Sequence, residues 1–516
     1  MTGSGARVWF VVLAAVSLGL RFWFAQVMPF TGDEAYFYWW GRFPDWGFYD
    51  HPPMIGWWLA GLSAVSQAEW WLRLPIVIQP VVLALAVALF LRDRAAGLRW
   101  GAAILVLLAP VNVWNIFVTT DTPLIYFSVL SALAFARAAR DDDLRFYALA
   151  GLLLGGAFLS KYFSAFLGIA YFVYCAWRPC AAKVRGLLVL SLCAVPALVP
   201  MVWWNMEHCW SNIMFNVFNR NDDAGWAWYK PVLYVITLLY VLTPVMCWRS
   251  VRSWRTYATA AHEPGGAALT TVAFFPLALF AIMSIGKTVG LHWVLSFVPL
   301  VIVAYARAFD AHSLNLAIAG TVAIALIEVL LIAGVAMTPL ESWRTFKPLA
   351  GKMEGVILTF KSDELLAQIR PYREQGWVIA TDGYSNSVTL AYKEGTYWPV
   401  FGRGSSHARH DDILTNFKRL DGRDILVLVK RDAPVAKDFE PYFRDVDYRP
   451  FEIHGGKFWL VEGRGFDYAA YREGVLEGIR QSWYDVPAWL PQRACYFCSR
   501  YFPDRACQAE RAGSMP

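Results

Sequence analysis

Long apolar segments recur through the first two thirds of the chain. Eleven of them are long enough, or nearly long enough, to cross a bilayer as a helix of about 20 residues. They lie at residues 8–27, 74–91, 100–118, 122–136, 146–160, 162–177, 186–204, 231–248, 268–285, 289–305 and 313–337. With 57% hydrophobic residues and 26 Trp, the 516-residue chain is also too apolar for an ordinary soluble enzyme. The sequence therefore predicts a polytopic α-helical membrane protein with about 11 to 13 transmembrane helices.

Two segments need a closer interpretation. Residues 146–177 are apolar for 32 residues, with only Ser160-Lys161 in the middle, which is too long for one span. We therefore expect two short helices with a turn at Lys161. The 13-residue segment "MIGWWLAGLSAVS" (Met54–Ser66) is short for a span, and we predict an interfacial or re-entrant helix there.

Positive charge predicts the orientation in the membrane, because cytoplasmic loops carry an excess of Lys and Arg. One side receives six of these cations: Arg42, Arg73, Lys161, Arg220, Lys230 and Lys287. The other side receives thirteen: Arg92, Arg94, Arg99, Arg137, Arg140, Arg145, Arg178, Lys183, Arg185, Arg249, Arg252, Arg255 and Arg307. The second side is predicted to be cytoplasmic, together with the N-terminus. The first run has no small-residue cleavage site at its end and is predicted to be a retained helix.

The composition becomes polar and charged after Met337. With an odd number of spans this region lies outside the cytoplasm. Its runs "WVIAT", "DILVLVK" and "FWLVEG" are typical of strands, and "DELLAQIRPYREQG" and "SNSVTLAYKEG" of helices. We predict a transmembrane catalytic domain at 1–338, with a periplasmic first loop at 28–73, and a C-terminal extracytoplasmic α/β domain at 339–516.

Cysteine usage differs between the two regions. Of the eight cysteines, Cys175, Cys180, Cys193 and Cys247 lie in or near spans and are expected to be small hydrophobic residues. Three more are close together in the tail, at Cys495, Cys498 and Cys507. In an oxidising compartment they predict one disulfide with a leftover thiol, or alternatively a zinc site without an obvious fourth ligand.

The predicted topology gathers the unusual ionisable residues on the outer side. They are Asp33, Glu34, Asp50 and His51 in the first loop, Asp121 in "TTDTP", Lys161 in "SKYF", His208 after Trp204, and Lys287 and His292 in "GKTVGLHW". Ionisable groups at a membrane surface are costly unless they are solvated or paired, so recurrence at one depth indicates a shared polar cavity. A structural explanation exists for each residue taken singly.

Three of these structural explanations are specific. Thr31 and Glu34 fit a capping box, and Asp33 favours the positive end of the same helix. Lys161 and Lys287 are each as compatible with snorkelling towards lipid headgroups as with a function. Asp121 precedes Thr122-Pro123 and fits a helix N-terminus. The joint placement of the residues, and not any one of them, favours a functional site, in which Asp33 is the preferred acid and Glu34 has a supporting role.

The residue types indicate the chemistry. A carboxylate can take a proton from an attacking hydroxyl, and Arg21, His51, Lys161 and Lys287 can neutralise a phosphate leaving group. The chain has no Gly-rich phosphate loop between a strand and a helix, and no soluble nucleotide donor is expected outside the cytoplasm. A lipid phosphate is therefore the predicted partner. The net charge of +6 comes from loop cations without a basic stripe, so no nucleic acid is expected.

Four segments in order resemble one family. "GDEAYFYWWGRFPDWGFYDHPP", "TTDTPLIYF", "GGAFLSKYFSAFL" and "GKTVGLHWVLSFVPL" are similar to motifs of the bacterial family 39 and family 83-like glycosyltransferases, the protein-mannosyltransferase-related branch of the GT-C superfamily. The resemblance covers roughly Arg21 to Pro299. "TDGYSNSVTLAYKEG" and "FGRGSSHARHDDIL" look like weaker pieces of the same family's C-terminal part.

The resemblance implies a GT-C fold and an activity. The implied activity is inverting transfer of a sugar from a polyprenyl phosphate, with undecaprenyl phosphate as the expected carrier. The implied acceptor is lipid A, another envelope glycan or a protein on the outer side of the bacterial inner membrane. Asp33 matches the first-loop acid, which implies a general base or a substrate-orienting carboxylate, and Asp121 matches the second acid. Lys161, Lys287 and His292 are implied to hold the phosphate, and Tyr36 and Asp50 to contact substrate. Relatives that transfer aminoarabinose have a phosphate-binding lysine where this chain has His51.

A metal site and two other functions are alternative interpretations of the same residues. Some relatives carry a divalent metal near this loop, and Asp50, His51 and His208 could supply ligands, but no metal-ligand spacing favours one, so no cofactor is predicted. A proton-coupled transporter is the rival from another class, although inverted repeats with broken midplane helices are not evident. A catalytically silent receptor on the same fold is a third possibility. A lost transfer activity in an Asp33→Asn protein discriminates the enzyme from both.

Overall fold

The structure is a computed structural model that describes residues 3–219, 225–263, 265–343, 346, 352–403 and 409–505. It divides into two compact units. The first, here called the helical unit, comprises Met1–Met28, Val65–Pro200 and Asp222–Met337. The second, here called the mixed unit, comprises Pro29–Ala64, Met201–Asn221 and Thr338–Pro516. The segments 29–64 and 201–221 thus form one compact body with the C-terminal region.

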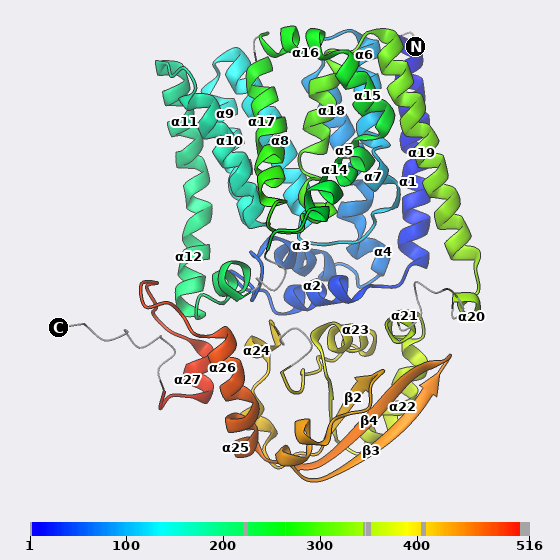
Figure 1. The fold of residues 1–516 in the computed structure, drawn as a ribbon, viewed down its shortest axis with the longest axis vertical. Coiled ribbons are helices and arrows are strands. Elements are labelled where there is room, and N and C mark those ends of the chain that lie inside the picture. The colour runs from blue at the N-terminus through cyan, green and yellow to red at the C-terminus, as the bar shows by residue number, and fades with distance from the viewer. Residues whose placement is uncertain are drawn as a thin grey trace, which may run out of the picture. The chain divides into compact units, whose positions relative to one another are not determined.

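The helical unit is a bundle built from most of the apolar runs (Figure 1). Its elements are α1 Gly3–Val27, α4 Glu69–Leu72, α5 Leu74–Phe90, α6 Ala96–Leu107, α7 Pro110–Trp114, α8 Asp121–Asp141, α9 Leu144–Phe158, η1 Tyr162–Ser164, α10 Ala165–Ala176, α11 Ala181–Ala194, η2 Val195–Ala197, α14 Tyr229–Leu242, α15 Pro244–Arg252, α16 Trp254–Ala261, α17 Gly266–Met283, η4 Leu291–Trp293, α18 Val298–Ala306 and α19 Ala311–Met337. Helix α12 (Leu198–Glu207) begins in this unit and ends in the mixed unit.

Among the described residues, six helices are long and apolar enough to cross a membrane, and a seventh span arises if the bent pair α14 and α15 is counted as one. Large apolar side chains face outward on these helices; Leu192 of α11 is 73% exposed and Leu330 of α19 is 71% exposed. Such surfaces suit lipid and not water. The protein is therefore a multi-pass membrane protein, while the total of about 11 to 13 spans stays a prediction.

Several apolar runs are broken where the sequence alone indicated continuous segments. The run 231–248 bends by 92° between α14 and α15, at Thr243-Pro244, where proline removes a backbone donor and the Thr243 side chain accepts from the Met246 amide. The run 100–118 stops at Leu107 and restarts at Pro110. A length of apolar sequence therefore fixes burial better than it fixes helix continuity.

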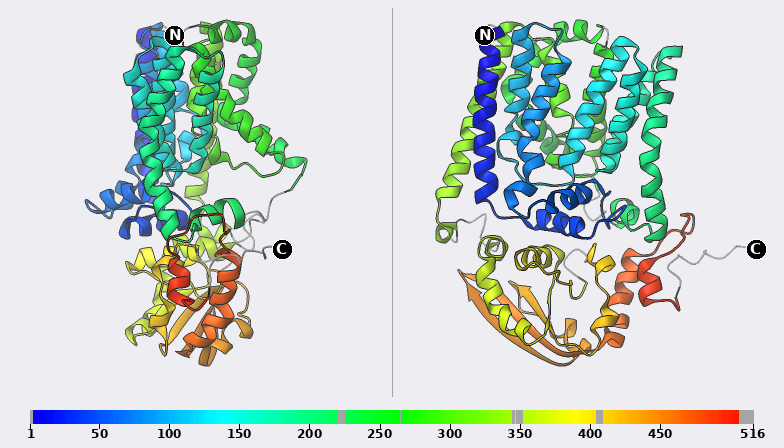
Figure 2. Two further views of the ribbon diagram at one scale, coloured as in Figure 1. Left: turned by 90° about the vertical axis from the view of Figure 1, so that its left-hand side faces the viewer. Right: turned by 180° about the vertical axis from the view of Figure 1, so that it is seen from behind.

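The predicted break at Lys161 is confirmed. Helix α9 ends at Phe158, Lys161 is extended with φ of −164°, and η1 and α10 follow. Helix α9 packs against both α8 and α11, as the views from three sides show (Figure 1; Figure 2). The contact with α11 is close, because a Cβ at Gly151 would lie 2.2 Å from the backbone oxygen of Leu190.

The mixed unit combines short helices with one four-stranded sheet, and the predicted α/β character of the C-terminal region is confirmed. Its helices are α2 Gly32–Arg42, α3 Met54–Ser63, α13 Ser211–Ile213, η3 Met214–Asn219, α20 Leu340–Trp343, α21 Met353–Phe360, α22 Ser362–Glu374, α23 Tyr384–Glu394, α24 Asp411–Leu414, η6 Phe417–Leu420, η7 Ala436–Asp438, η8 Glu440–Tyr442, α25 Tyr468–Tyr471, η9 Arg472–Leu476, α26 Glu477–Trp483 and α27 Tyr496–Tyr501. Helix α3 matches the short helix expected at Met54–Ser66.

The sheet has the order β1-β2-β4-β3. Strands β1 (Val378–Thr381) and β2 (Ile425–Lys430) pair in parallel, while β4 (Gly456–Phe466) pairs antiparallel with β2 and with β3 (Phe443–Ile453). The apolar runs in the sequence predict β1, β2 and β4. They do not predict β3, whose segment "FRDVDYRPFEI" is rich in charged residues and contains Pro450. An edge position explains both features, since an edge strand faces solvent and tolerates proline.

Helix α2 packs tightly within the mixed unit. A Cβ at Gly41 would meet the backbone of Leu59 in α3 at 2.9 Å, and one at Gly32 would meet the Ser385 hydroxyl of α23 at 2.2 Å. Glycine at these two positions lets α2 approach both neighbouring helices. The first loop is therefore held by C-terminal residues that follow it by more than three hundred positions, as the Trp39 indole donating to the Val388 carbonyl 349 residues away illustrates.

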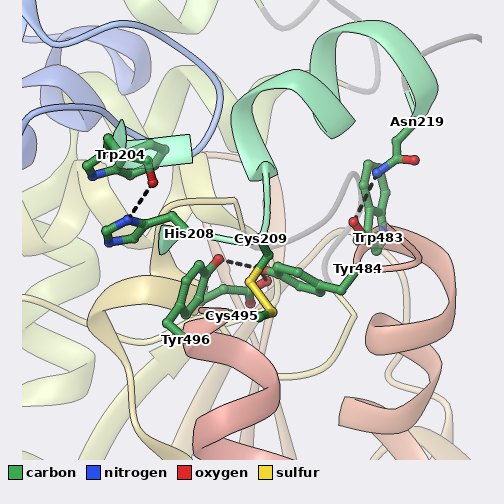
Figure 3. The surroundings of a disulfide bond; sticks show 9 residues. Trp204, His208, Cys209, Asn219, Trp483, Tyr484, Cys495 and Tyr496 are labelled. Carbon is green, nitrogen blue, oxygen red and sulfur yellow. Dashed lines mark hydrogen bonds between the residues drawn. A yellow bond between two sulfur atoms is a disulfide. The ribbon is translucent and has the colours of Figure 1, made fainter. Parts of the chain in front are cut away.

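The cysteine prediction for the tail is wrong for Cys495. Cys495 forms a disulfide with Cys209, 286 residues away (Figure 3). His208 and Cys495 also pair in an isolated antiparallel β-bridge. Cys498 is disulfide-bonded as well, so neither residue is a thiol or a zinc ligand, and Cys507 lies outside the described residues. The pairing was missed because Cys209 stands alone in the sequence and only the fold of the mixed unit brings it to the tail.

Candidate active site

A charged cluster lies at the end of the first loop, in the mixed unit. The buried carboxylate of Asp50 accepts a hydrogen bond from the Tyr36 hydroxyl at 3.1 Å. Its other oxygen lies 3.2 Å from a guanidinium nitrogen of Arg409, and its first oxygen lies 3.5 Å from Nδ1 of His51. The structure thus brings together the three predicted residues Tyr36, Asp50 and His51 and adds Arg409.

These partners determine the charge of Asp50. Burial raises the pKa of Asp50. His51, Arg409 and the Tyr36 hydroxyl lower the pKa by more than burial raises it, so that it is about 2. The pKa of Tyr36 is raised well above its usual value, first by burial and then by the Asp50 charge. Asp50 is therefore an ionised carboxylate at neutral pH, and Tyr36 is a neutral hydrogen-bond donor.

Arg409 occupies an unusual position for a charged residue. Its backbone is left-handed, with φ of +58°, and its guanidinium carbon lies 4.1 Å from the ring centre of Tyr384 and 5.1 Å from that of Phe215. Cation–π contacts of this kind favour a partly desolvated arginine. Burial lowers the pKa of Arg409, but Asp50, Tyr384, Tyr36 and Asp33 outweigh burial and raise it, so Asp33 is electrostatically coupled to this guanidinium.

Asp33 and Glu34 have different environments although they are adjacent. The capping box at the start of α2 is confirmed: the buried Glu34 carboxylate accepts from the Thr31 amide and hydroxyl, each at 3.1 Å. Asp33 is exposed in the same first turn. Of the two acids, only Asp33 therefore presents its carboxylate to solvent, whereas Glu34 caps the helix.

His410, next to Arg409, is a buried neutral histidine. Its Nδ1 accepts the backbone N–H of Tyr49 at 3.3 Å, and its own amide donates to the Tyr36 hydroxyl at 3.3 Å. Burial lowers the pKa of His410 to about 4 despite the charge of Asp50. The sequence analysis did not assign either residue a role, although both belong to "FGRGSSHARHDDIL", one of the weaker C-terminal motifs.

His208, one of the residues considered as a metal ligand, has other partners. Nδ1 of His208 lies 2.9 Å from the Trp204 carbonyl, its ring stacks on Trp204 and its Nε2 is 3.9 Å from Asp45 (Figure 3 shows His208 and Trp204). Burial lowers the pKa of His208. Within the described residues, no group of three or more His, Cys, Asp or Glu side chains is arranged to hold a metal ion.

A buried ion pair lies in the helical unit. Both carboxylate oxygens of Asp121, in the first turn of α8, accept from Nζ of Lys161 at 2.9 Å, and both side chains are about one tenth exposed. Lys161 also lies 5.9 Å from the ring centre of Phe163. The second acid and the Ser-Lys-Tyr segment, predicted to share a site, are thus in direct contact.

Lys287 and His292 lie on the segment that joins α17 and α18. Lys287 is half-buried, and His292 is exposed in η4. The buried ammonium of Lys230 anchors this segment by donating to the Gly286 carbonyl at 3.1 Å and the Gly225 carbonyl at 2.8 Å. The Gly225 amide donates to Gly286 as well, at 2.9 Å. The Gly286 carbonyl before Lys287 therefore accepts two hydrogen bonds, one from Lys230 and one from the Gly225 amide.

Arg21 has a different environment from the other predicted phosphate ligands. It is 2% exposed, and its guanidinium donates to the backbone carbonyls of Val77 at 2.9 Å and Asn115 at 2.7 Å and to those of Ile76 and Asn112. Each nitrogen therefore has at least one backbone acceptor. This arrangement ties α1 to the start of α5 and to α7.

The predicted site residues are divided between the two units. Asp33, Glu34, Tyr36, Asp50 and His51 belong to the mixed unit. Arg21, Asp121, Lys161, Lys287 and His292 belong to the helical unit. That the two sets share one cavity stays a prediction.

Comparisons with known proteins agree on one superfamily. A family model described as dolichyl-phosphate-mannose-protein mannosyltransferase matches residues 50–204. Over 224 residues the chain is 27% identical to the lipid A galacturonosyltransferase RgtD of Rhizobium johnstonii. The aligned part is 41% of this chain and 46% of RgtD, so the chain spans less than half the length of this curated relative.

One of the similar solved structures shows the fold of the chain. The chain is similar to ArnT from Cupriavidus metallidurans, solved bound to undecaprenyl phosphate, with a TM-score of 0.62, 15% identity and coverage of 88% of this chain and 98% of ArnT. A weaker likeness, with a TM-score of 0.44 and 12% identity, covers 90% of this chain and 77% of the oligosaccharyltransferase AglB of Archaeoglobus fulgidus, solved with an inhibitory peptide and a dolichol-phosphate. The chain has the fold of ArnT, and the expected resemblance to GT-C glycosyltransferases related to lipid A-modifying enzymes is confirmed.

Proposed function

We propose that this multi-pass membrane protein, with the fold of a GT-C enzyme, is an inverting glycosyltransferase. It moves a sugar from a polyprenyl phosphate, with undecaprenyl phosphate as the carrier, to lipid A or another envelope glycan. The reaction takes place on the periplasmic side of the bacterial inner membrane. The observation that carries this proposal is the sequence similarity to a lipid A galacturonosyltransferase, together with a family-model match that contains Asp50, His51, Asp121 and Lys161.

Asp33 is the proposed general base. An acceptor hydroxyl attacks the anomeric carbon while its proton passes to the Asp33 carboxylate, and the bond between that carbon and the phosphate oxygen breaks with its electron pair on the phosphate. This single displacement inverts the anomeric carbon. The exposure of Asp33 supports this role, because a base needs access to the acceptor.

Lys161 and Lys287 are proposed to neutralise the departing phosphate, with His51 and His292 as further contacts. Asp121 then acts through Lys161, since both of its oxygens already accept from that ammonium. An ammonium held by one carboxylate keeps a fixed position and further N–H donors for a phosphate oxygen. We therefore assign Asp121 a positioning role and not that of a second base.

Three further roles follow from the contacts. Arg21 is proposed to be structural, because its guanidinium serves four backbone carbonyls. Glu34 is proposed to hold the first turn of α2 and thereby the backbone of Asp33. Asp50, with Arg409 and Tyr36, is proposed to hold the end of the same loop in place. Asp50 then acts on the substrate indirectly, through His51 and Tyr36.

The test of the proposal is a mass comparison. Lipid A and envelope glycans from host cells with and without the gene are compared by mass spectrometry, and purified protein is incubated with polyprenyl phosphates carrying galacturonic acid, an aminopentose or a neutral hexose. A single sugar mass missing from lipid A in the deletion strain is expected. A sugar missing instead from a periplasmic protein would assign a protein acceptor, as in the mannosyltransferase family. Unchanged envelope masses and no transfer from any donor would contradict the proposal.

A further inference from the structure

A large pocket lies in the C-terminal part of the mixed unit, apart from the residues considered so far. It has a volume of about 610 Å³ and opens where the parallel strands β1 and β2 end. Asp382 directly follows β1, and Lys430 is the last residue of β2. Ligands of α/β sheets commonly bind in the crevice beyond the carboxyl ends of parallel strands. The volume is within the range of about 300–1,000 Å³ that is usual for small-molecule sites.

The pocket has an apolar floor and a charged rim. Phe401, Phe439 and Val475 are buried beneath it. Around them stand three cationic side chains and three carboxylates: Arg403, Lys430, Lys437, Asp382, Asp432 and Asp438. The equal numbers disfavour a multiply charged anion or cation, and the rim is too polar for a lipid chain. A ring that has an apolar face and many hydroxyl groups satisfies the floor and the rim together.

Two of the charged groups that line the pocket are joined by hydrogen bonds. Lys430 donates to the side-chain oxygen of Asn386 at 2.9 Å, and the amide of Asn386 donates to Asp382 at 3.0 Å. Burial raises the pKa of the Asp382 carboxyl. This chain of contacts joins the ends of both strands to α23 and fixes a carboxylate and an ammonium side by side, an acceptor and a donor for adjacent hydroxyl groups.

The pocket adjoins the Asp50 cluster along the chain. Asp382 lines the pocket, and Tyr384, two residues later, lies 5.2 Å from the ring of Tyr36 and 4.1 Å from the guanidinium of Arg409. The single residue Gly383 separates the two. The wall of the pocket and the Asp50 cluster are therefore connected through a short stretch of backbone within the same compact unit.

We infer that this pocket is a carbohydrate-binding subsite, which holds a sugar ring of the acceptor glycan remote from the hydroxyl that is modified. The role as an acceptor subsite rests on the proposed transferase function, whereas sugar binding by the pocket does not. Binding energy from such a remote ring would lower the acceptor KM and help to align the attacking hydroxyl.

The probe for the test is the oligosaccharide released by mild acid from the lipopolysaccharide of the host, which lacks acyl chains. Its binding to the full-length protein in nanodiscs is measured by calorimetry and by saturation-transfer NMR. Lys437→Ala and Asp432→Asn each remove one group of the rim, and Ala433→Trp fills the pocket. Lys418→Ala removes an exposed lysine of η6 outside the pocket and is the matched control.

The expected result is saturable binding to the wild type and the control, about tenfold weaker binding to the Lys437 and Asp432 variants, and loss of binding in Ala433→Trp. In the transfer assay the same variants raise the acceptor KM and leave kcat and the donor KM unchanged. If no transfer is found with any donor but the binding pattern holds, the transferase proposal fails and the sugar site stands. Wild-type protein that does not bind the oligosaccharide, or pocket variants that bind it as tightly as the control, would overturn the inference.

Discussion

The carboxylate of Asp50 lies 3.2 Å from the guanidinium of Arg409, a residue 359 positions further along the chain. Asp50 is 1% exposed at its side chain and Arg409 is 17% exposed. The pair joins the first loop to the C-terminal region within one compact unit. It therefore couples the stability of the loop that carries Asp33 to the folding of the C-terminal region.

Removing Arg409 alone is expected to destabilise the mixed unit strongly. Arg409→Gln leaves the Asp50 charge buried without its guanidinium, which costs about 3–5 kcal/mol. The double variant Asp50→Asn/Arg409→Gln is expected to recover part of this loss, because no unpaired charge remains. Thermal unfolding of the two single variants and the double variant measures the coupling, with Arg419→Gln on the exposed η6 as control. Additive losses would show that the two side chains do not interact.

Acidification is expected to destabilise the mixed unit through His410. The folded pKa of about 4 lies below the ordinary value of 6.5, so between these pH values the unfolded chain binds a proton that the folded chain does not. The contribution of His410 to stability is thus present above pH 6.5 and is lost as the pH falls towards 4. Asp50, Asp45 and Asp412 favour the proton, and His208 opposes it.

A matched variant isolates this effect. In His410→Asn the side-chain oxygen can replace Nδ1 as the acceptor for the Tyr49 amide, yet it does not titrate. Unfolding temperatures measured from pH 7 to pH 4.5 are expected to fall less steeply for this variant than for the wild type. Parallel curves for the two proteins would exclude His410 as a titrating group in this range.

The two members of the Asp121–Lys161 pair are expected to differ in kinetics. Lys161→Met removes a cation proposed to contact the leaving phosphate and should lower kcat at least about 100-fold. Asp121→Asn keeps a hydrogen-bond acceptor for Lys161 but loosens its position, so a smaller loss is expected. Steady-state transfer rates measure both, and the folded state is checked by the unfolding temperature. A larger loss in Asp121→Asn than in Lys161→Met would favour Asp121 as a base.

The Cys209–Cys495 bond is expected to stabilise the mixed unit. It closes a stretch of 286 residues, and removal of a native disulfide typically costs about 2–5 kcal/mol. Cys209→Ser and Cys495→Ser should lower the unfolding temperature equally, and the double variant should add no further loss. Peptide mapping without reductant should recover the two cysteines in one linked pair. Free thiols at both positions in protein isolated from membranes would contradict the oxidising location proposed for this unit.

Much of the helical unit could be predicted from the sequence because helices that cross a bilayer need long apolar segments. The turn at Lys161 followed from a run too long for one helix and one polar pair within it. The bend at Thr243-Pro244 was not predicted. Hydropathy measures the polarity of side chains and does not detect the backbone N–H that proline lacks. Strand β3 was missed because an edge strand with charged residues has no apolar alternation.

The site was predictable only in part. Tyr36, Asp50 and His51 were found because they stand together in one motif, and in the structure Asp50 contacts both Tyr36 and His51. Arg409 and His410 were missed because their partners are hundreds of residues away and only the tertiary fold of the mixed unit brings them together. The pairing of Cys209 was missed for the same reason. Its partner, Cys495, has two cysteines closer to it in the sequence, Cys498 and Cys507.

The account depends most on Asp33, and one assay tests it directly. Purified wild-type and Asp33→Asn proteins are compared for transfer of a labelled sugar from undecaprenyl phosphate to lipid A, with the sugar identified from the envelope masses. We expect transfer by the wild type, a loss of about 10²–10⁴-fold in Asp33→Asn and an unchanged unfolding temperature. Transfer by Asp33→Asn at the wild-type rate, or a wild-type protein that leaves the lipid-linked sugar intact, would contradict it.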